Sequence, residues 1–249
     1  MQSFAPGAHS AENIKESIDK SVAALKSVKI NIMYLHAPDR ETSFAETCKA
    51  IDAAHKAGHF KEFGLSNFAP NEVEEVVKIC EENKYVKPTV YQGQYNAIAR
   101  LSETELVPTL RKHGLKYYAY SPSASGIFTG KLSAESAKVK GGRFDEESVV
   151  GKLYGGQYLK PEILNAAGKV HKEAEAQGLS GHEVALRWVL HHSVLDGSKG
   201  DVMILGASSM KQLEQNLKCC QGGPLPDDLI KLIDSTWEEA KATAPHAHM

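Results

Sequence analysis

The chain has 249 residues, 42% of them hydrophobic and 24% charged, an ordinary globular composition with room for one α/β barrel or two small domains. Its formal net charge of −2 leaves no excess of Lys and Arg to neutralise phosphates, so nucleic acid is not an expected partner. No apolar run approaches the ~18 residues of a membrane span. Four cysteines without a C-x-x-C spacing indicate a reduced, cytoplasmic protein.

Helices and short apolar strands alternate along the first half of the chain. Apolar residues recur at helical spacing after Ser10, and the β-branched run 28–36 follows, which predicts a helix and then a buried strand. The same order repeats, with further strands expected at 61–67, 88–92 and 115–121. Two Ser–Glu pairs have the spacing of a capping box and predict helix starts: Ser43 with Glu46, and Ser102 with Glu105.

The second half begins with a change of rhythm. The polar, Gly-rich stretch 122–160 is too long for an ordinary connection, so we expect a functional loop there. The alternation then resumes with helices at 161–177, 182–192, after Ser209 and near 227–242, and with a strand at 201–206. Five strands alternating with helices predict a parallel sheet with helical crossovers.

Each predicted strand ends in polar residues, and in parallel α/β folds that edge carries the active groups. For any single position a structural role is the commoner explanation: Asn67 or Ser209 as a helix cap, His36 as a buried histidine. Polar residues at all five ends together favour a binding site. These residues are His36, Ser66 with Asn67, Gln92, Tyr120 with Ser121, and Gly206 to Ser209.

The motifs at these ends are Tyr-Leu-His-Ala-Pro-Asp at 34–39, Gly-Leu-Ser-Asn-Phe at 64–68, Val-Tyr-Gln-Gly-Gln-Tyr-Asn at 90–96, Tyr-Ala-Tyr-Ser-Pro at 118–122 and Ile-Leu-Gly-Ala-Ser-Ser at 204–209. They resemble aldo-keto reductases. The branch they resemble most contains aflatoxin-aldehyde and succinic-semialdehyde reductases, with fungal aryl-alcohol dehydrogenases nearby. The resemblance runs in order from about Ala11 to Trp237.

The resemblance implies a (β/α)8 barrel of the TIM type that reduces aldehydes or ketones with NADP(H) and without a metal. His36 would be the catalytic histidine that hydrogen-bonds the substrate carbonyl, and Tyr154 a second substrate contact. The implied nicotinamide contacts are Ser66, Asn67, Gln92 and Tyr120, of which Tyr120 stacks on the ring. The implied phosphate and adenosine contacts are Ser121, Ser123, Gly126, Lys131, Arg143, Gly206, Ser208, Ser209, Gln212, Gln215 and Asn216.

Three members of the family's catalytic tetrad, an Asp, a Tyr and a Lys, have no match in this sequence. The resemblance therefore implies an incomplete barrel whose opening three βα units are missing, with 1–249 forming the C-terminal part of one reductase domain. Without the tyrosine acid the chain is expected to be slow or inactive, and the alternative is a non-catalytic cofactor-binding or regulatory paralogue. The sequence leaves three points open: the preference between NADPH and NADH, the natural substrate, and whether the chain forms a homo-oligomer. The tail residues His246 and His248 lack further ligands, so no metal site is expected.

Overall fold

The computed structural model describes residues 5–26, 28–133 and 142–246, which fall into two compact units. The first contains 5–93 and 104–118, and the second contains 94–103 and 119–246. Five strands follow one another in the order β1-β2-β3-β4-β5, as the alternation predicts. They are β1 Ile30–Leu35, β2 Phe60–Ser66, β3 Pro88–Gln94, β4 Lys116–Tyr120 and β5 Val202–Met203.

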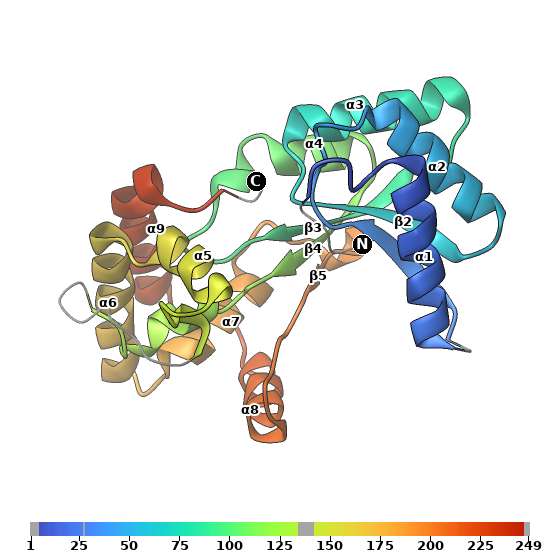
Figure 1. The fold of residues 1–249 in the computed structure, drawn as a ribbon. Coiled ribbons are helices and arrows are strands. Elements are labelled where there is room, and N and C mark those ends of the chain that lie inside the picture. The colour runs from blue at the N-terminus through green and yellow to red at the C-terminus, as the bar shows by residue number, and fades with distance from the viewer. Residues whose placement is uncertain (1–4, 27, 134–141, 247–249) are drawn as a thin grey trace. The chain divides into compact units, whose positions relative to one another are not determined.

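The first unit packs four helices in chain order: α1 Ala11–Leu25, α2 Phe44–Lys56, α3 Pro70–Asn83 and α4 Leu106–Lys112. Each contacts the next, and Figure 1 shows α1, α2 and α3 side by side. The predicted starts of α1 and α2 are confirmed, because Ser10 accepts a hydrogen bond from the Asn13 amide and Ser43 accepts one from the Glu46 amide.

The strands of the first unit are parallel and in register at their ends. Leu35 of β1 lies opposite Leu65 of β2, and Ser66 of β2 lies opposite Gln92 of β3. The residues that end these strands are therefore neighbours, which is what places polar groups together at this edge. The core beneath them is apolar and fully buried, with Leu35, Phe63, Leu65, Val73, Val76, Val90 and Tyr91 at its centre.

The second unit is mainly helical, with α5 Val149–Tyr158, α6 Pro161–Ala176, α7 Gly181–His191, α8 Met210–Cys220 and α9 Asp227–Ala240. Helix α6 packs on α9, and α7 packs on α8. Trp188 of α7 is buried with its ring 5.9 Å from that of Tyr95, and the guanidinium of Arg100 lies 4.9 Å from the Trp188 ring. This aromatic cluster joins the 94–103 segment to the helices.

Three predicted elements are wrong in detail. The Ser102–Glu105 capping box does not form: α4 begins at Leu106, and Ser102 is buried in a 3₁₀ turn with its hydroxyl unpaired. The stretch 122–160, expected as a loop, contains helix α5, started by Ser148, whose hydroxyl accepts from the Gly151 amide. The strand expected at 201–206 is shorter in the structure, because β5 contains only residues 202–203. The Ile204 amide still donates a hydrogen bond to the Ala119 carbonyl.

The α/β class with parallel strands is confirmed. Closure into a barrel, the missing opening units and the single-domain assignment stay predictions. Within the described ranges, none of the helices combines the length and the hydropathy needed to cross a membrane.

Candidate functional site

The ends of β1 and β2 are joined through Asn67. Its side-chain amide donates to the backbone carbonyl of His36 at 2.8 Å and to the hydroxyl of Ser66 at 3.1 Å. Asn67 has a positive φ of 62°, a conformation that Asn tolerates better than most residues. Asn67 is not a helix cap: α3 starts three residues later, where the Glu72 carboxylate accepts from the Ala69 amide.

A cavity of about 320 Å³ runs along β1 from Ile30 to His36 and reaches Ser66 of β2 and Gln92 of β3. Three of the sequence-predicted residues line it: His36, Ser66 and Gln92. Its other walls are apolar side chains and two hydroxyls from α1 and β1, namely Ser21, Leu25, Ile30, Ile32, Met33 and Tyr34. A mostly apolar hollow with a few convergent polar groups is the form of a small-molecule site.

His36 is half-buried, and burial lowers the pKa of its imidazole. The ring is therefore neutral near pH 7, and a neutral imidazole carries one N–H donor and one acceptor nitrogen. Such a group can donate a hydrogen bond to a carbonyl oxygen without carrying a charge into the cavity.

Tyr34 is a cavity residue that the strand-end rule does not find. Its ring lies against Gly64 of β2, where a Cβ atom would come within 2.5 Å of Cδ1. Burial raises the pKa of Tyr34 to about 12, although a hydrogen bond with Gln92 acts in the opposite direction. The signal in the sequence is the alternation within β1, which sends Tyr34 and His36 to the same face.

The turn after β1 is held by the buried carboxylate of Asp39. It accepts from the amides of Gly7, His9 and Glu41 and from the hydroxyl of Thr42. Burial alone would raise the pKa of Asp39, but these four hydrogen bonds outweigh it and lower the pKa to about 2. Asp39 therefore fixes the segment before α1 against the turn that follows His36.

In the second unit the end of β4 turns sharply at Ser121, which has a positive φ of 56°. The Tyr120 carbonyl accepts from the Tyr95 amide at 3.2 Å, and the Ser121 carbonyl accepts from the Ala124 amide at 2.9 Å. Tyr120 is half-buried, and burial raises the pKa of its hydroxyl.

The loop that follows contains further residues in the left-handed region. Ala124 and Ser125 have positive φ without being glycine, and Gly126 and Gly130 share it. Conformations of this kind cluster at ligand-binding loops. The Ser125 hydroxyl is buried without a hydrogen-bond partner, as a group awaiting a ligand would be. Of the predicted contacts in this loop, Lys131 is exposed and Ser123 accepts from the Gly126 amide.

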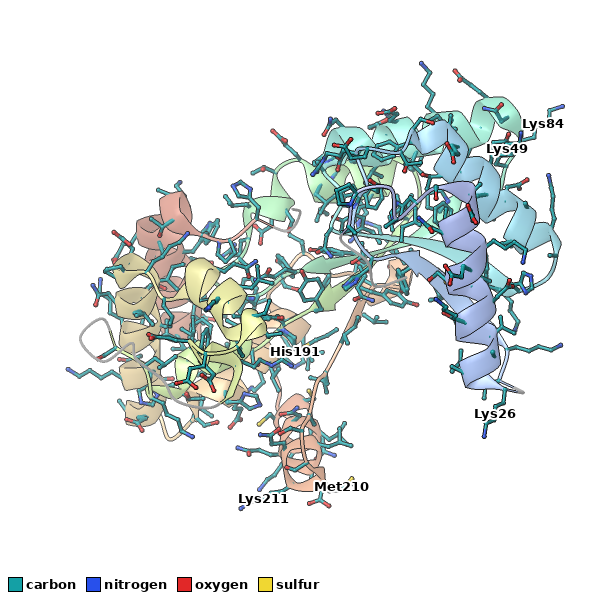
Figure 2. All side chains as sticks on the ribbon, in the orientation of Figure 1. Lys26, Lys49, Lys84, His191, Met210 and Lys211 are labelled. Carbon is teal, nitrogen blue, oxygen red and sulfur yellow. The ribbon has the colours of Figure 1, made fainter. Side chains whose placement is uncertain are left out.

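The start of α8 brings together most of the predicted adenosine-end residues. Ser209 caps the helix by accepting from the Gln212 amide at 3.2 Å. The Gln212 side chain accepts from the amide and hydroxyl of Ser208, and Asn216 donates to the Gly206 carbonyl. The first turn is open to solvent: Figure 2 shows Met210 and Lys211 projecting from it, and Met210 is 69% exposed. Gln215 is exposed on the same helix.

Arg143 and Tyr154, the remaining predicted residues, contact one another. The guanidinium lies 5.6 Å from the Tyr154 ring, and a Cβ atom on Gly206 would come 3.7 Å from Arg143 Nη2. Arg143 is exposed and lies beside the turn that leads into α8. A guanidinium in this position can bind a phosphate group of a ligand. Tyr154 stacks on Tyr158, with ring centroids 6.4 Å apart.

Over the described ranges, no three His, Cys, Asp or Glu side chains are grouped as a metal site requires. His246 lies inside those ranges and His248 outside them. All four cysteines carry free thiols.

Comparison with known proteins supports one family. The sequence profile described as the aldo/keto reductase family matches residues 1–238. An aldo-keto reductase of Pseudocercospora fijiensis is 39% identical over 240 residues, which are 96% of this chain and 81% of that protein. Aflatoxin B1 aldehyde reductase member 2 is 40% identical in Homo sapiens and 39% identical in Rattus norvegicus. These two matches cover 94% of this chain, and 67% and 65% of the human and rat proteins.

Proposed function

The chain belongs to the aldo/keto reductase family, a family of oxidoreductases, and on that premise we propose that it binds NADPH and reduces aldehydes or ketones to alcohols. The observation that carries the proposal is the convergence of His36, Ser66 and Gln92 on one cavity of the first unit. Ser66 and Gln92 belong to β2 and β3, and His36 directly follows β1. Strand-end polar groups that line one hollow serve one ligand.

The residues suit a dinucleotide. In the first unit, Ser66, Asn67 and Gln92 present hydroxyl and amide groups that match a nicotinamide carboxamide. Tyr120, in the second unit, is proposed as the aromatic contact of the nicotinamide ring on the resemblance alone. In the second unit, the buried Ser125 hydroxyl and the exposed Arg143 guanidinium are groups that a pyrophosphate or an adenosine phosphate would engage. Bound NADPH would supply a hydride from nicotinamide C4 to the carbonyl carbon.

His36 is proposed to orient the substrate. Because its imidazole is neutral, an N–H of the ring donates to the carbonyl oxygen and fixes the carbon for attack. Asn67 holds the His36 backbone in place through the 2.8 Å hydrogen bond. Tyr154, on α5 in the second unit, is proposed as a substrate contact on the resemblance alone.

The proton for the alcohol needs an acid, and no residue of these 249 matches the family's tyrosine. Tyr34 lines the cavity, but its pKa of about 12 makes it a weaker acid than an ordinary tyrosine, so it is not assigned that role. The second candidate function is that the chain binds the cofactor without turning it over.

One experiment separates the two. The purified chain is titrated with NADPH by fluorescence, and its turnover is measured with 4-nitrobenzaldehyde and with succinic semialdehyde. NADPH binding with turnover supports the reductase, and binding without turnover supports the cofactor-binding paralogue. No binding at millimolar NADPH overturns both. The four free thiols support the cytoplasm as the proposed location.

A further inference from the structure

We propose that Asn96 is a positioning residue that sets the Tyr120–Ser121 turn, and through it the aromatic face on which a nicotinamide ring stacks. The proposal rests on the proposed function, because Tyr120 is assigned to the nicotinamide there. Asn96 itself is not among the predicted cofactor contacts. All the residues in the argument belong to the second unit.

Asn96 is completely buried, and each polar atom of its side chain is engaged. Its amide nitrogen donates to the Ser121 carbonyl at 3.0 Å and to the Tyr158 hydroxyl at 2.9 Å. Its amide oxygen accepts from the Ile98 amide at 3.0 Å. Asparagine is the only residue of this size that offers two donors and an acceptor at once, so both its size and its chemistry are used.

The Ser121 carbonyl needs such a partner, because the backbone at Ser121 lies in the left-handed region. A non-glycine residue stays there only when its surroundings hold it. Two donors meet that carbonyl, the Asn96 side chain and the Ala124 amide. The Tyr95 amide holds the preceding carbonyl, that of Tyr120. The segment 95–96 therefore holds the peptide groups that follow Tyr120 and Ser121, and the peptide group before Tyr120 is held by the Ile204 amide, which donates to the Ala119 carbonyl.

Tyr158 extends the arrangement to α5. Its buried hydroxyl accepts from both Asn96 and Gln94, and its ring stacks on Tyr154. Tyr120 is close enough to Tyr154 and Tyr158 for their charges to influence its pKa. Asn96 thus ties the end of β4 to the helix that carries the proposed substrate contact.

The test compares two ligands. NADPH has a nicotinamide ring, whereas adenosine 2′,5′-bisphosphate has only the adenosine end. We expect Asn96→Ala to raise the Kd for NADPH about tenfold, the worth of one buried hydrogen bond, and to leave the Kd for the bisphosphate nearly unchanged. Asn96→Asp keeps the acceptor for Ile98 but loses both donors, so it serves as the second variant and should show the same selectivity.

Two controls exclude a general loss of structure. Ile233→Ala removes buried apolar atoms from α9 in the same unit, and it should lower the melting temperature without changing the ratio of the two Kd values. The second control is Tyr120→Ala, which removes the side chain through which Asn96 is proposed to act. Adding Asn96→Ala to that background should then have no further effect on NADPH binding, so the two effects are not additive.

Equal weakening of both ligands by Asn96→Ala and Asn96→Asp, or additive effects with Tyr120→Ala, would overturn the positioning role while leaving the proposed function standing. Failure of the unmodified chain to bind NADPH would overturn the proposed function and this inference together. The two failures are therefore distinguished by the unmodified chain alone.

Discussion

The amide of Asn67 donates to the carbonyl of His36 across the ends of two parallel strands, at 2.8 Å. The second hydrogen of the same amide is directed to the Ser66 hydroxyl. One side chain therefore fixes the exit of β1 and the exit of β2 relative to each other. The backbone of Asn67 lies in the left-handed region, with a φ of 62°.

The first prediction separates the backbone of Asn67 from its side chain. Asn67→Gly keeps an unstrained left-handed conformation and loses the amide, whereas Asn67→Ala loses the amide and adds strain of about 1 kcal/mol. Urea unfolding should therefore find Asn67→Ala the less stable of the two. Both variants should weaken NADPH binding to a similar extent. Equal stabilities would show that the left-handed conformation carries no cost here.

The second prediction concerns His36. In whatever turnover the chain shows with 4-nitrobenzaldehyde, His36→Ala should lower kcat/KM about 10²-fold, because a positioned hydrogen-bond donor to the carbonyl is lost. His55, half-buried on α2 with its ring hydrogen-bonded to the Lys61 carbonyl, provides the control His55→Ala. An unchanged kcat/KM in His36→Ala would remove His36 from the substrate site.

The third prediction concerns Tyr34, the cavity tyrosine. Its raised pKa argues against a role as the acid, so Tyr34→Phe should leave kcat within about threefold, far from the 10²–10⁴-fold loss expected for a general acid. Steady-state kinetics with succinic semialdehyde measure this. A loss of two orders of magnitude would instead identify Tyr34 as the replacement for the family's tyrosine.

The fourth prediction is a pH dependence of stability. His9 is buried, and burial lowers the pKa of its ring, with the neighbouring Asp39 opposing the shift in part. The unfolded chain therefore binds a proton at His9 more readily than the folded chain does. The contribution of the neutral His9 ring to the free energy of unfolding is complete above the unfolded pKa of about 6.5, and it is lost as the pH falls below that value. Burial lowers the pKa of His36 and of His192 too, with the same sign.

Melting temperatures measured between about pH 7 and pH 5 should fall, and His9→Asn should fall less steeply because one of the titrating groups is gone. Asp39 acts in a lower window: with a folded pKa of about 2, its contribution is lost only as the pH drops below about 4. A slope unchanged by His9→Asn would mean that His9 is protonated without cost in the folded chain.

Local signals in the sequence predict much of the fold. Ser10, Ser43 and Ser209 all cap helices as expected, because an N-cap depends only on residues within the next turn. Ser102 fails because tertiary packing buries it in a 3₁₀ turn. Helix α5 is missed since three of its ten residues are glycines, which weaken the helical signal.

The candidate site divides in the same way. Strand ends predict that His36, Ser66 and Gln92 converge, since parallel strands deliver their last residues to one edge. The contact of Asn96 with Tyr158 joins residues 62 positions apart, and no local pattern encodes such a separation. The cofactor roles assigned by resemblance stay predictions.

The last prediction concerns the exposed side of the first unit. β1 stands at one end of the strand order, and beside it Leu25 is 43% exposed and Val28 is 64% exposed. Ile30 and Ile32 add apolar walls to the cavity on this side. A strand edge next to apolar side chains is a template for pairing with a second chain. We therefore expect the 249-residue chain to self-associate at micromolar concentration, as sedimentation velocity would measure.

Charge at the same positions should suppress this association. In the double variant Leu25→Glu and Val28→Lys, lysine beside an edge strand opposes pairing, and the two replaced side chains are 43% and 64% exposed. Met210→Lys on α8 is the control, because it removes an exposed apolar side chain from the second unit. The control should leave association unchanged. If it suppressed association as strongly as the double variant, or if the unmodified chain were a monomer throughout, the β1 edge would not be the contact surface.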